Sequence, residues 1–342
     1  MTGSERSDAE TRWAGWTRGF IQALAGIVAG YLALAYAIDP FDSGRSPLLS
    51  VGAVRPQGPR TSAALRGRDP AYQGAVFGNS HIQLIEPGRL AQTTGIPFVQ
   101  LSIPATGPNE QFALMNWYLR HHAAPRALVV AADNLWCTND PALPNDKPFP
   151  FWLFSEHIAV YLRGLLRWSV LEELPDRIGW LLRKQRETAP RDGWWDYEAD
   201  YAAIGHTGHP GTAAGHEARA PEMPEPGTAG PSFPAAERFA AIAAGLPAET
   251  ALVLVFPPIY ADALPRPGTP RERAEQACKA ALTASVRGHR RSAVLDWRRD
   301  GPEARDAALF FDPSHYRHPL AQKIAADIAA AIVTLEDGTK AR

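Results

Sequence analysis

The sequence predicts an α/β protein: a three-layer α/β/α sandwich around a parallel sheet, preceded by an N-terminal transmembrane helix and interrupted by a helical and loop insertion. Short apolar runs that are typical of buried strands alternate with helical patterns along most of the chain. The chain has 342 residues, of which 45% are hydrophobic, so it can fill a large core. Its formal net charge is only -1 and it has no basic block, which excludes nucleic acid as a partner.

The first element is an uncharged apolar run at residues 20–38, FIQALAGIVAGYLALAYAI. Its length fits the roughly 20 residues that cross a bilayer, so it predicts a single transmembrane anchor. Trp13 and Trp16 before it and Tyr36 near its end suit the two membrane interfaces. A buried helix of a soluble protein is a further reading, which the length of the run disfavours.

Arginines predict the orientation of this anchor. Arg6, Arg12 and Arg18 precede the run, and Arg45 and Arg55 follow it. The small excess on the N-terminal side favours residues 1–19 in the cytoplasm and the rest of the chain in the periplasm, held at the inner membrane.

The alternative to an anchor is a signal peptide, because Ala35-Tyr36-Ala37 resembles a processing site. Cleavage there would yield a secreted protein, so both readings export the domain.

Two cysteines, Cys137 and Cys278, are the only ones in the chain. In an oxidising compartment they can form a disulfide, and as buried thiols they can also remain apart. Their spacing does not decide between these alternatives.

Residues 39–70 are rich in Pro, Gly, Ser and Arg and predict a linker to an α/β domain at residues 71–342. The strands expected in this domain are residues 74–77, 98–103, 127–133, 251–256 and 292–297. The helices expected between and after them are residues 109–122, 271–286 and 320–335. Strands of continuous apolar character predict a parallel sheet that is covered on both faces.

Residues 141–240 predict an insertion between the third and fourth strands, with a helical part at residues 155–174. A later part, residues 203–234, has few large apolar side chains and predicts a loop. His206, His209 and His216 lie in this loop. They suit either a zinc site or a solvated loop without fixed geometry, and the second reading is favoured.

The candidate active site follows the strands, since ligands bind at the carboxyl ends of a parallel sheet. Ser80 follows the first strand in the stretch GAVFGNSHIQL, and Asp312 and His315 lie in the loop before the last helix. A serine hydroxyl needs a base, and the base needs a group that fixes its tautomer. The sequence therefore predicts Ser80 as nucleophile, His315 as base and Asp312 as its orienting carboxylate. His81 is a poor base for Ser80, because adjacent side chains leaving a strand point to opposite sides.

Further residues after the strands predict the rest of the site. The Ser80 N–H, Gly107 and the side chain of Asn109 or Asn134 are the expected donors of an oxyanion hole. The substrate cleft is expected to include the following side chains: His81, Trp136 and Tyr260. Trp194, Trp195 and Tyr197 suit either a carbohydrate-binding cleft or core packing.

Two motifs give the chain a resemblance to the SGNH, or GDSL-like, hydrolase superfamily, particularly its membrane-anchored members in exopolysaccharide and cell-wall acylation. GNS at residues 78–80 and DPSH at residues 312–315 match the superfamily's serine block and its D-x-x-H block, in the same order. Gly107 and Asn134 stand near the positions of its glycine and asparagine blocks, without clean motifs. The resemblance covers about residues 74–335 outside the insertion. It implies a flavodoxin-like fold and a Ser80, His315 and Asp312 triad.

What the resemblance implies about function is a serine esterase or O-acyltransferase that acts on acyl groups, in particular acetyl groups, of an extracellular polysaccharide. A membrane-bound partner that supplies the acyl group is implied as well. No metal and no cofactor are expected, and the sequence has no Gly-rich phosphate loop. The alternatives are a non-catalytic glycan-binding or assembly protein of a polysaccharide export system, and a metal-dependent enzyme that uses the histidine-rich loop.

Overall fold

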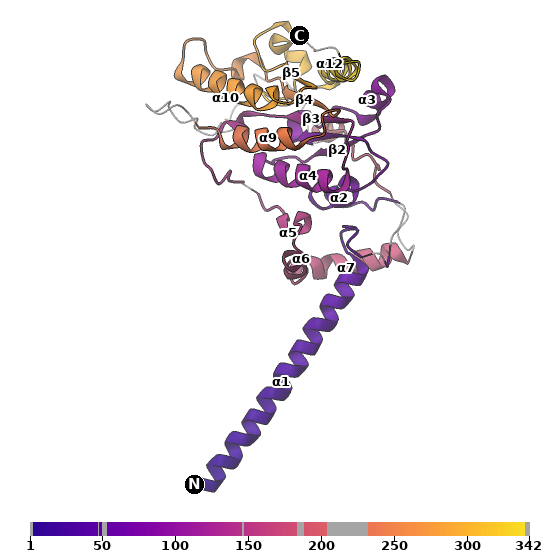
Figure 1. The fold of residues 1–342 in the computed structure, drawn as a ribbon, viewed down its shortest axis with the longest axis vertical. Helices are drawn as coiled ribbons and strands as arrows, with labels where there is room; N and C mark the ends of the chain where they lie inside the picture. The colour runs from indigo at the N-terminus through magenta and orange to yellow at the C-terminus, as the bar shows by residue number, and fades with distance from the viewer. Residues whose placement is uncertain are drawn as a thin grey trace.

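The structure is a computed structural model that describes residues 3–46, 48–49, 53–145, 147–182, 188–203 and 232–338. The described residues form a three-layer α/β/α sandwich with a long N-terminal helix projecting from it (Figure 1). This is the fold class that the sequence predicts. The histidines of the expected loop, His206, His209 and His216, lie outside the described residues.

A parallel sheet forms the middle layer. Its strands are β1 (Gly74–Gly78), β2 (Phe98–Ser102), β3 (Ala127–Ala131), β4 (Ala251–Phe256) and β5 (Ser292–Asp296). They pair in parallel in the order β2-β1-β3-β4-β5. Strands β1 to β4 are buried along their whole length, which explains why each is a continuous apolar run. This is the doubly wound flavodoxin-like order, and its switch point lies between β1 and β3.

Helices cover both faces of the sheet. One face packs against α2 (Pro59–Gly67), α4 (Pro108–His121), α9 (Pro234–Gly245) and α10 (Pro270–Arg287). The other face packs against α3 (Pro87–Thr94) and α12 (His318–Glu336). Strand side chains alternate between the two cores, with Phe77 on the first and Val76 on the second. The closing helix α12 buries a stripe at helical spacing that includes Leu320, Ile324 and Ile328.

The remaining helical segments are short or lie outside the sandwich. They are α5 (Phe151–Phe154), α6 (Ile158–Leu165), α7 (Trp168–Leu181), α8 (Tyr197–Ala203) and α11 (Pro302–Arg305). Single 3₁₀ turns are η1 (Ser80–Ile82), η2 (Asn134–Cys137), η3 (Ala261–Ala263) and η4 (Ala307–Leu309). Two of these turns, η1 and η2, directly follow β1 and β3 and so lie at the switch point.

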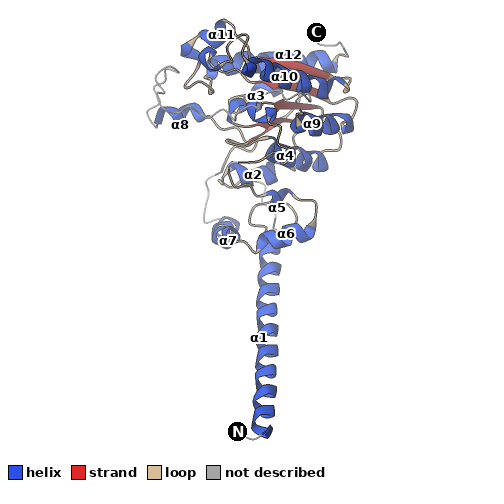
Figure 2. Ribbon diagram, turned by 90° about the vertical axis from the view of Figure 1, so that its left-hand side faces the viewer, coloured by secondary structure: helices blue, strands red, loops and turns tan. Residues whose placement is uncertain are grey.

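Helix α1 (Gly3–Ile38) projects away from the sandwich, and α6 and α7 lie across its C-terminal end (Figures 1 and 2). Its segment Arg12–Ile38 is long and apolar enough to cross a membrane. The helix is joined to α6 by a hydrogen bond from the Tyr31 hydroxyl to the carbonyl of Leu165, at 2.7 Å. Beyond its end, the buried pair of Arg177 and Asp42 joins α7 to the turn that follows α1.

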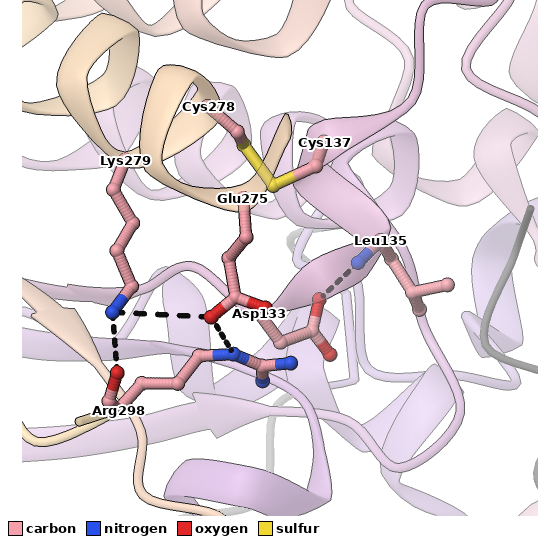
Figure 3. Close-up of a disulfide and its surroundings, with 7 residues drawn as sticks. All are labelled: Asp133, Leu135, Cys137, Glu275, Cys278, Lys279 and Arg298. Carbon is pink, nitrogen blue, oxygen red and sulfur yellow. Dashed lines mark hydrogen bonds and ion pairs between the residues drawn. A yellow bond between two sulfur atoms is a disulfide. The ribbon is translucent and has the colours of Figure 1, made fainter. Parts of the chain in front are cut away.

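A disulfide joins Cys137 in η2 to Cys278 in α10 (Figure 3). Of the two alternatives that the sequence leaves open, the structure has the bonded one. Both sulfur-bearing side chains are buried. Close to the disulfide, the guanidinium of Arg298 pairs with the carboxylate of Glu275 at 2.9 Å (Figure 3). The disulfide thus fixes the turn that follows β3 to α10, and the ion pair fixes the segment after β5 to the same helix.

Removal of this disulfide is expected to destabilise the domain. The bonded cysteines are 141 residues apart, and closing a loop of that length restricts the unfolded chain by about 5 kcal/mol in the chain-entropy model. We expect the double variant Cys137→Ala/Cys278→Ala to lose about 2–5 kcal/mol of unfolding free energy in urea titrations. Reduction of the wild-type protein is the matched control. An unchanged urea midpoint in both would contradict this prediction.

Candidate active site

Ser80 is positioned by the turn that ends β1. Gly78 has φ +153°, and a Cβ there would approach Ile82 to 2.7 Å and Ala131 to 3.0 Å, so the turn requires glycine. The next residue, Asn79, caps η1, because its side-chain oxygen accepts the N–H of His81 at 3.1 Å. Its amide group donates to the carbonyl of Thr106 at 3.2 Å, in the loop that follows β2. Gly78 and Asn79 therefore form the turn that presents the Ser80 hydroxyl.

The Asp312–His315 turn is built around the aspartate. One carboxylate oxygen of Asp312 accepts the backbone N–H groups of Ser314 and His315, at 2.8 and 2.9 Å. The other oxygen lies 2.8 Å from Nδ1 of the His315 ring. The D-x-x-H spacing thus folds the chain back so that the carboxylate reaches the imidazole. Tyr260 supports this turn from outside, since its N–H donates to the carbonyl of Pro313 at 2.9 Å.

Three side chains from the two ends of the domain form a connected row. The His315 Nε2 atom lies 2.9 Å from the Ser80 hydroxyl oxygen, and His315 Nδ1 lies 2.8 Å from Asp312. A carboxylate only accepts, so Nδ1 carries the ring proton and Nε2 of the neutral ring accepts from the serine hydroxyl. The His315 and Asp312 side chains are 17% and 20% exposed, so the row is shielded but open to a substrate. This is the geometry of a serine nucleophile with its base and orienting acid.

Asp312 is held in its ionised form. Burial raises its pKa, but the hydrogen bond and charge of His315 and the two backbone N–H groups outweigh burial and hold the pKa well below its usual range. The carboxylate is therefore negative at neutral pH. The negative charge of Asp312 beside Nδ1 stabilises the positive imidazole ring that forms when His315 accepts a proton.

Two aromatic rings pack against the ring of His315. Tyr197 and Tyr201, both from α8, have ring centroids 5.8 and 5.4 Å from that of His315. The Tyr197 ring is buried, and its hydroxyl donates to the carbonyl of Tyr316 at 3.0 Å. Of the two roles that the sequence allows for Tyr197, the structure supports core packing. The Tyr197 ring also packs on the ring of His315.

A second histidine–carboxylate pair flanks Ser80. The His81 Nδ1 atom lies 3.1 Å from Asp133, and the His81 ring centroid is 5.2 Å from that of His315. Asp133 also accepts a hydrogen bond from the Asn79 amide group. Burial raises the pKa of Asp133, but the bond to His81, the bond to Asn79 and the charge of Arg298 lower it below its usual value. His81 therefore pairs with Asp133, and its ring lies beside that of His315.

The residues expected in the oxyanion hole lie in different settings. The Gly107 N–H caps α4 by donating to the Glu110 carboxylate at 3.1 Å, so it is already engaged. The Asn109 side chain accepts from Arg238 at 3.3 Å on an exposed part of α4. Asn134 is the first residue of η2 at the switch point and is half-buried. The Ser80 N–H opens η1, and a first-turn N–H has no partner within its own helix.

The two other residues expected in the cleft differ in exposure. Trp136 is completely buried, packs on Phe112 and Phe239, and donates its indole N–H to Gln111 at 3.0 Å. Its place is the core between η2 and the helices α4 and α9. Tyr260 is half-buried, next to the Asp312 turn. Within the part of the chain that the structure describes, no group of three or more His, Cys, Asp or Glu side chains is arranged to hold a metal ion.

No protein-family model matches the sequence, and no curated protein matches it either. Among solved structures, a carbohydrate esterase family 2 enzyme with its carbohydrate-binding domain, from Corynascus thermopiles (Myceliophthora fergusii), is similar. The match has 13% sequence identity and a TM-score of 0.32, and it covers 77% of this chain and 67% of that chain. We therefore base the assignment of the site on its own geometry.

Proposed function

We propose that this protein is a serine esterase or O-acyltransferase that acts on acyl groups of an extracellular polysaccharide. The observation that carries the proposal is the row of Ser80, His315 and Asp312, with successive separations of 2.9 and 2.8 Å. Its place at the switch point of a doubly wound sheet, where ligands of such folds bind, supports the proposal. The resemblance of GNS and DPSH to the SGNH superfamily agrees with it.

The proposed chemistry is acyl transfer in two steps. The Ser80 oxygen attacks the acyl carbonyl carbon while its proton passes to Nε2 of His315. The carbon–oxygen bond to the leaving alcohol then breaks, and that alcohol takes the proton from His315. In the second step, water or a sugar hydroxyl attacks the acyl-serine with His315 again as base, and Ser80 recovers its proton. Water gives hydrolysis, and a sugar hydroxyl gives transfer.

The proposed location is the outer face of the inner membrane. Helix α1 supplies an apolar span, and the disulfide suits an oxidising compartment such as the periplasm. An anchored domain would receive its acyl group from a membrane-bound partner and deliver it to a polysaccharide passing nearby.

A direct test uses the full-length protein and its Ser80→Ala variant in detergent. Both are given 4-nitrophenyl acetate, first alone and then with a deacetylated polysaccharide, and free acetate and O-acetylated polysaccharide are quantified. We expect wild type to form acetate, acetylated polysaccharide or both, and Ser80→Ala to form neither above the uncatalysed level. Equal product formation by the two proteins would refute the proposal, and equal formation at the uncatalysed level would favour a non-catalytic glycan-binding protein. The ratio of the two products separates esterase from transferase.

A further inference from the structure

A cavity lies against the outer edge of β2, the edge strand of the sheet. Its volume is about 230 Å³, and the side chains used below are among its lining: Gln57, Arg66, Gln83, Gln100, Trp194 and Trp195. One wall is the segment around residue 193, which docks on the edge strand through a bond of 2.6 Å from the Gln100 N–H to the Asp192 carbonyl. Gly193 has φ +78°, and a Cβ there would lie 2.6 Å from the Gln100 carbonyl oxygen. Glycine is therefore required for this close approach.

Four of the side chains that line the cavity carry buried polar atoms without a hydrogen-bond partner among the described residues. They are Nε2 and Oε1 of Gln57, Nε of Arg66, Oε1 of Gln100 and Nε1 of Trp194. Arg66 and Gln100 are only 8% and 3% exposed. A buried polar atom without a partner costs about 1–3 kcal/mol, so five of them on side chains that line one cavity point to a ligand.

Other bonds of these side chains fix the direction of the unpartnered atoms. The amide group of Gln100 donates to three carbonyls, at 3.1–3.3 Å, in the segment from Ile82 to Ile85. The two terminal nitrogens of Arg66 donate to Ser62 at 2.6 Å and to Pro190 at 3.0 Å. Neither side chain is free to turn toward other partners, so the site is already formed.

The mixture of donors and acceptors identifies the class of ligand. Gln57, Arg66 and Trp194 offer N–H donors, while Gln57 and Gln100 also offer carbonyl oxygens. A sulfate only accepts and a phosphate mainly accepts, so two carbonyl oxygens are poor partners for either. A sugar hydroxyl both donates and accepts. Trp195, 43% exposed at the cavity, adds a flat ring of the kind that stacks on a sugar face.

The volume restricts the ligand to one ring. Pockets for drug-sized molecules start at roughly 300 Å³, so this cavity accommodates a single sugar unit at the end or at a turn of a chain.

Two short stretches of chain connect the cavity to the catalytic row. Gln83, which lines it, is three residues beyond Ser80, and Gln100 holds the carbonyls of that same stretch. On the other side, Trp194 precedes Tyr197, whose ring packs on His315. We propose that the cavity binds one neutral sugar ring of the polysaccharide and so positions a neighbouring unit of that polysaccharide at Ser80. The second half of this statement rests on the proposed function.

Binding is tested without catalysis, in the full-length Ser80→Ala protein in detergent. Saturation-transfer NMR is recorded with glucose, galactose, mannose and N-acetylglucosamine, and with inorganic phosphate as competitor. We expect at least one sugar to bind, a fivefold to tenfold weaker affinity in Trp195→Ala, and no competition by phosphate. Trp168→Ala, which removes another exposed tryptophan on α7, is the control and should bind as the parent does.

The outcomes separate the two proposals. Absence of binding by all four sugars, or equal binding in Trp195→Ala, overturns the cavity as a sugar site. Competition by phosphate overturns the assignment of ligand class. If sugars bind but wild type turns over no ester, the sugar site stands and the proposed function fails. In active protein, Trp195→Ala should raise KM for the acetylated polysaccharide, and the control Trp168→Ala should leave that KM unchanged.

A second, independent observation concerns α6 and α7. These helices expose large apolar side chains although they belong to a folded domain. The side chains, with their exposed fractions, are Ile158 50%, Val160 42%, Leu166 50%, Trp168 72%, Leu171 43%, Ile178 39% and Leu182 61%. On α7, Leu171, Ile178 and Leu182 share one face of the helix, and the charged Glu172 and Asp176 lie on the next. The remaining face of α7 packs on the protein through buried residues that include Val170 and Leu174. A helix with a buried face, an exposed apolar face and a charged face is typical of one that lies in a membrane interface.

The position of α1 identifies the surface that covers these side chains. At 1.5 Å per residue, the distance from Trp16 to Tyr36 along α1 is about 30 Å, the thickness of a hydrocarbon core. With Trp16 at one interface, Tyr36 lies at the other, and Tyr31, two turns before the end of α1, contacts α6. Both views show α6 and α7 crossing this end of α1 (Figures 1 and 2). We infer that the exposed apolar face of α6 and α7 continues the lipid-facing surface of α1 and lies on the bilayer.

Site-directed spin labels test this inference. In the wild type both cysteines are bonded, so a single introduced cysteine is the one free thiol. Full-length Leu171→Cys, Asp176→Cys and Leu24→Cys proteins are labelled and placed in phosphatidylcholine–phosphatidylglycerol nanodiscs. Labels at residues 24 and 171 should be more accessible to oxygen than to a water-soluble nickel complex, and the label at 176 should show the reverse. A label at 171 as accessible to nickel as that at 176 would overturn the inference, while lipid contact at 24 alone would leave α1 as the only membrane element.

Discussion

Replacing His315 by alanine is expected to lower kcat for 4-nitrophenyl acetate by a factor on the order of 10⁴–10⁶. Nε2 of His315 lies 2.9 Å from the Ser80 hydroxyl oxygen, which is within hydrogen-bond distance, so this ring nitrogen can accept the hydroxyl proton. The neighbouring His81 is paired with Asp133, and its hydrogen bonds in the structure do not include one to the Ser80 hydroxyl. Without a base, Ser80 remains a weakly nucleophilic alcohol.

The control for this variant is His81→Ala, which removes a ring of the same kind 5.2 Å away. We expect the His81 variant to lose much less activity than the His315 variant. Added imidazole should restore part of the activity of His315→Ala, since a small base can occupy the space of the lost ring. A loss in His81→Ala equal to that in His315→Ala would contradict the assignment of the base.

Replacing Asp312 by asparagine is expected to lower kcat by a factor on the order of 10⁴. The amide of asparagine can donate to Nδ1, which would move the ring proton to Nε2 and leave no acceptor for the Ser80 proton. KM should change little, because Asp312 acts on His315 and not on the substrate. Asp306→Asn, which also changes an aspartate capping a short turn, is the control.

The Asp312→Asn substitution is also expected to change how the unfolding free energy depends on pH. Asp312 has a lowered pKa in the folded state, so its contribution is present above the unfolded value of about 3.9 and is lost as the pH falls. Wild type should therefore lose more unfolding free energy between pH 6 and pH 3 than Asp312→Asn does. Equal losses in urea titrations would show that the Asp312 carboxylate is not stabilised by its neighbours.

The elements of the fold could be predicted because the strands are buried on both faces and therefore appear as continuous apolar runs. The order of the strands in the sheet could not be predicted, because it depends on which strands pair with each other. Ser80 and His315 could be proposed from the sequence because each follows or precedes a clear element of the domain. Their approach to 2.9 Å depends on the whole sheet between them.

Other parts of the site depended on partners that are distant in the sequence. Glu110, three residues after Gly107, was the available signal that this glycine N–H would be used as a helix cap. No local signal indicated that Asp133 would bind His81, or that Trp136 would find Gln111 in the core. The sugar cavity combines side chains from α2, β2 and the segment around residue 193, which no sequence spacing relates.

The central claim is that Ser80 is a nucleophile activated by His315. The most direct measurement is labelling of the full-length protein with a fluorophosphonate probe, followed by mass spectrometry of the peptide that contains Ser80. We expect one covalent adduct, on Ser80, that forms rapidly in wild type and slowly or not at all in His315→Ala. An unlabelled Ser80 in folded wild-type protein, or equal labelling rates in the two proteins, would contradict it.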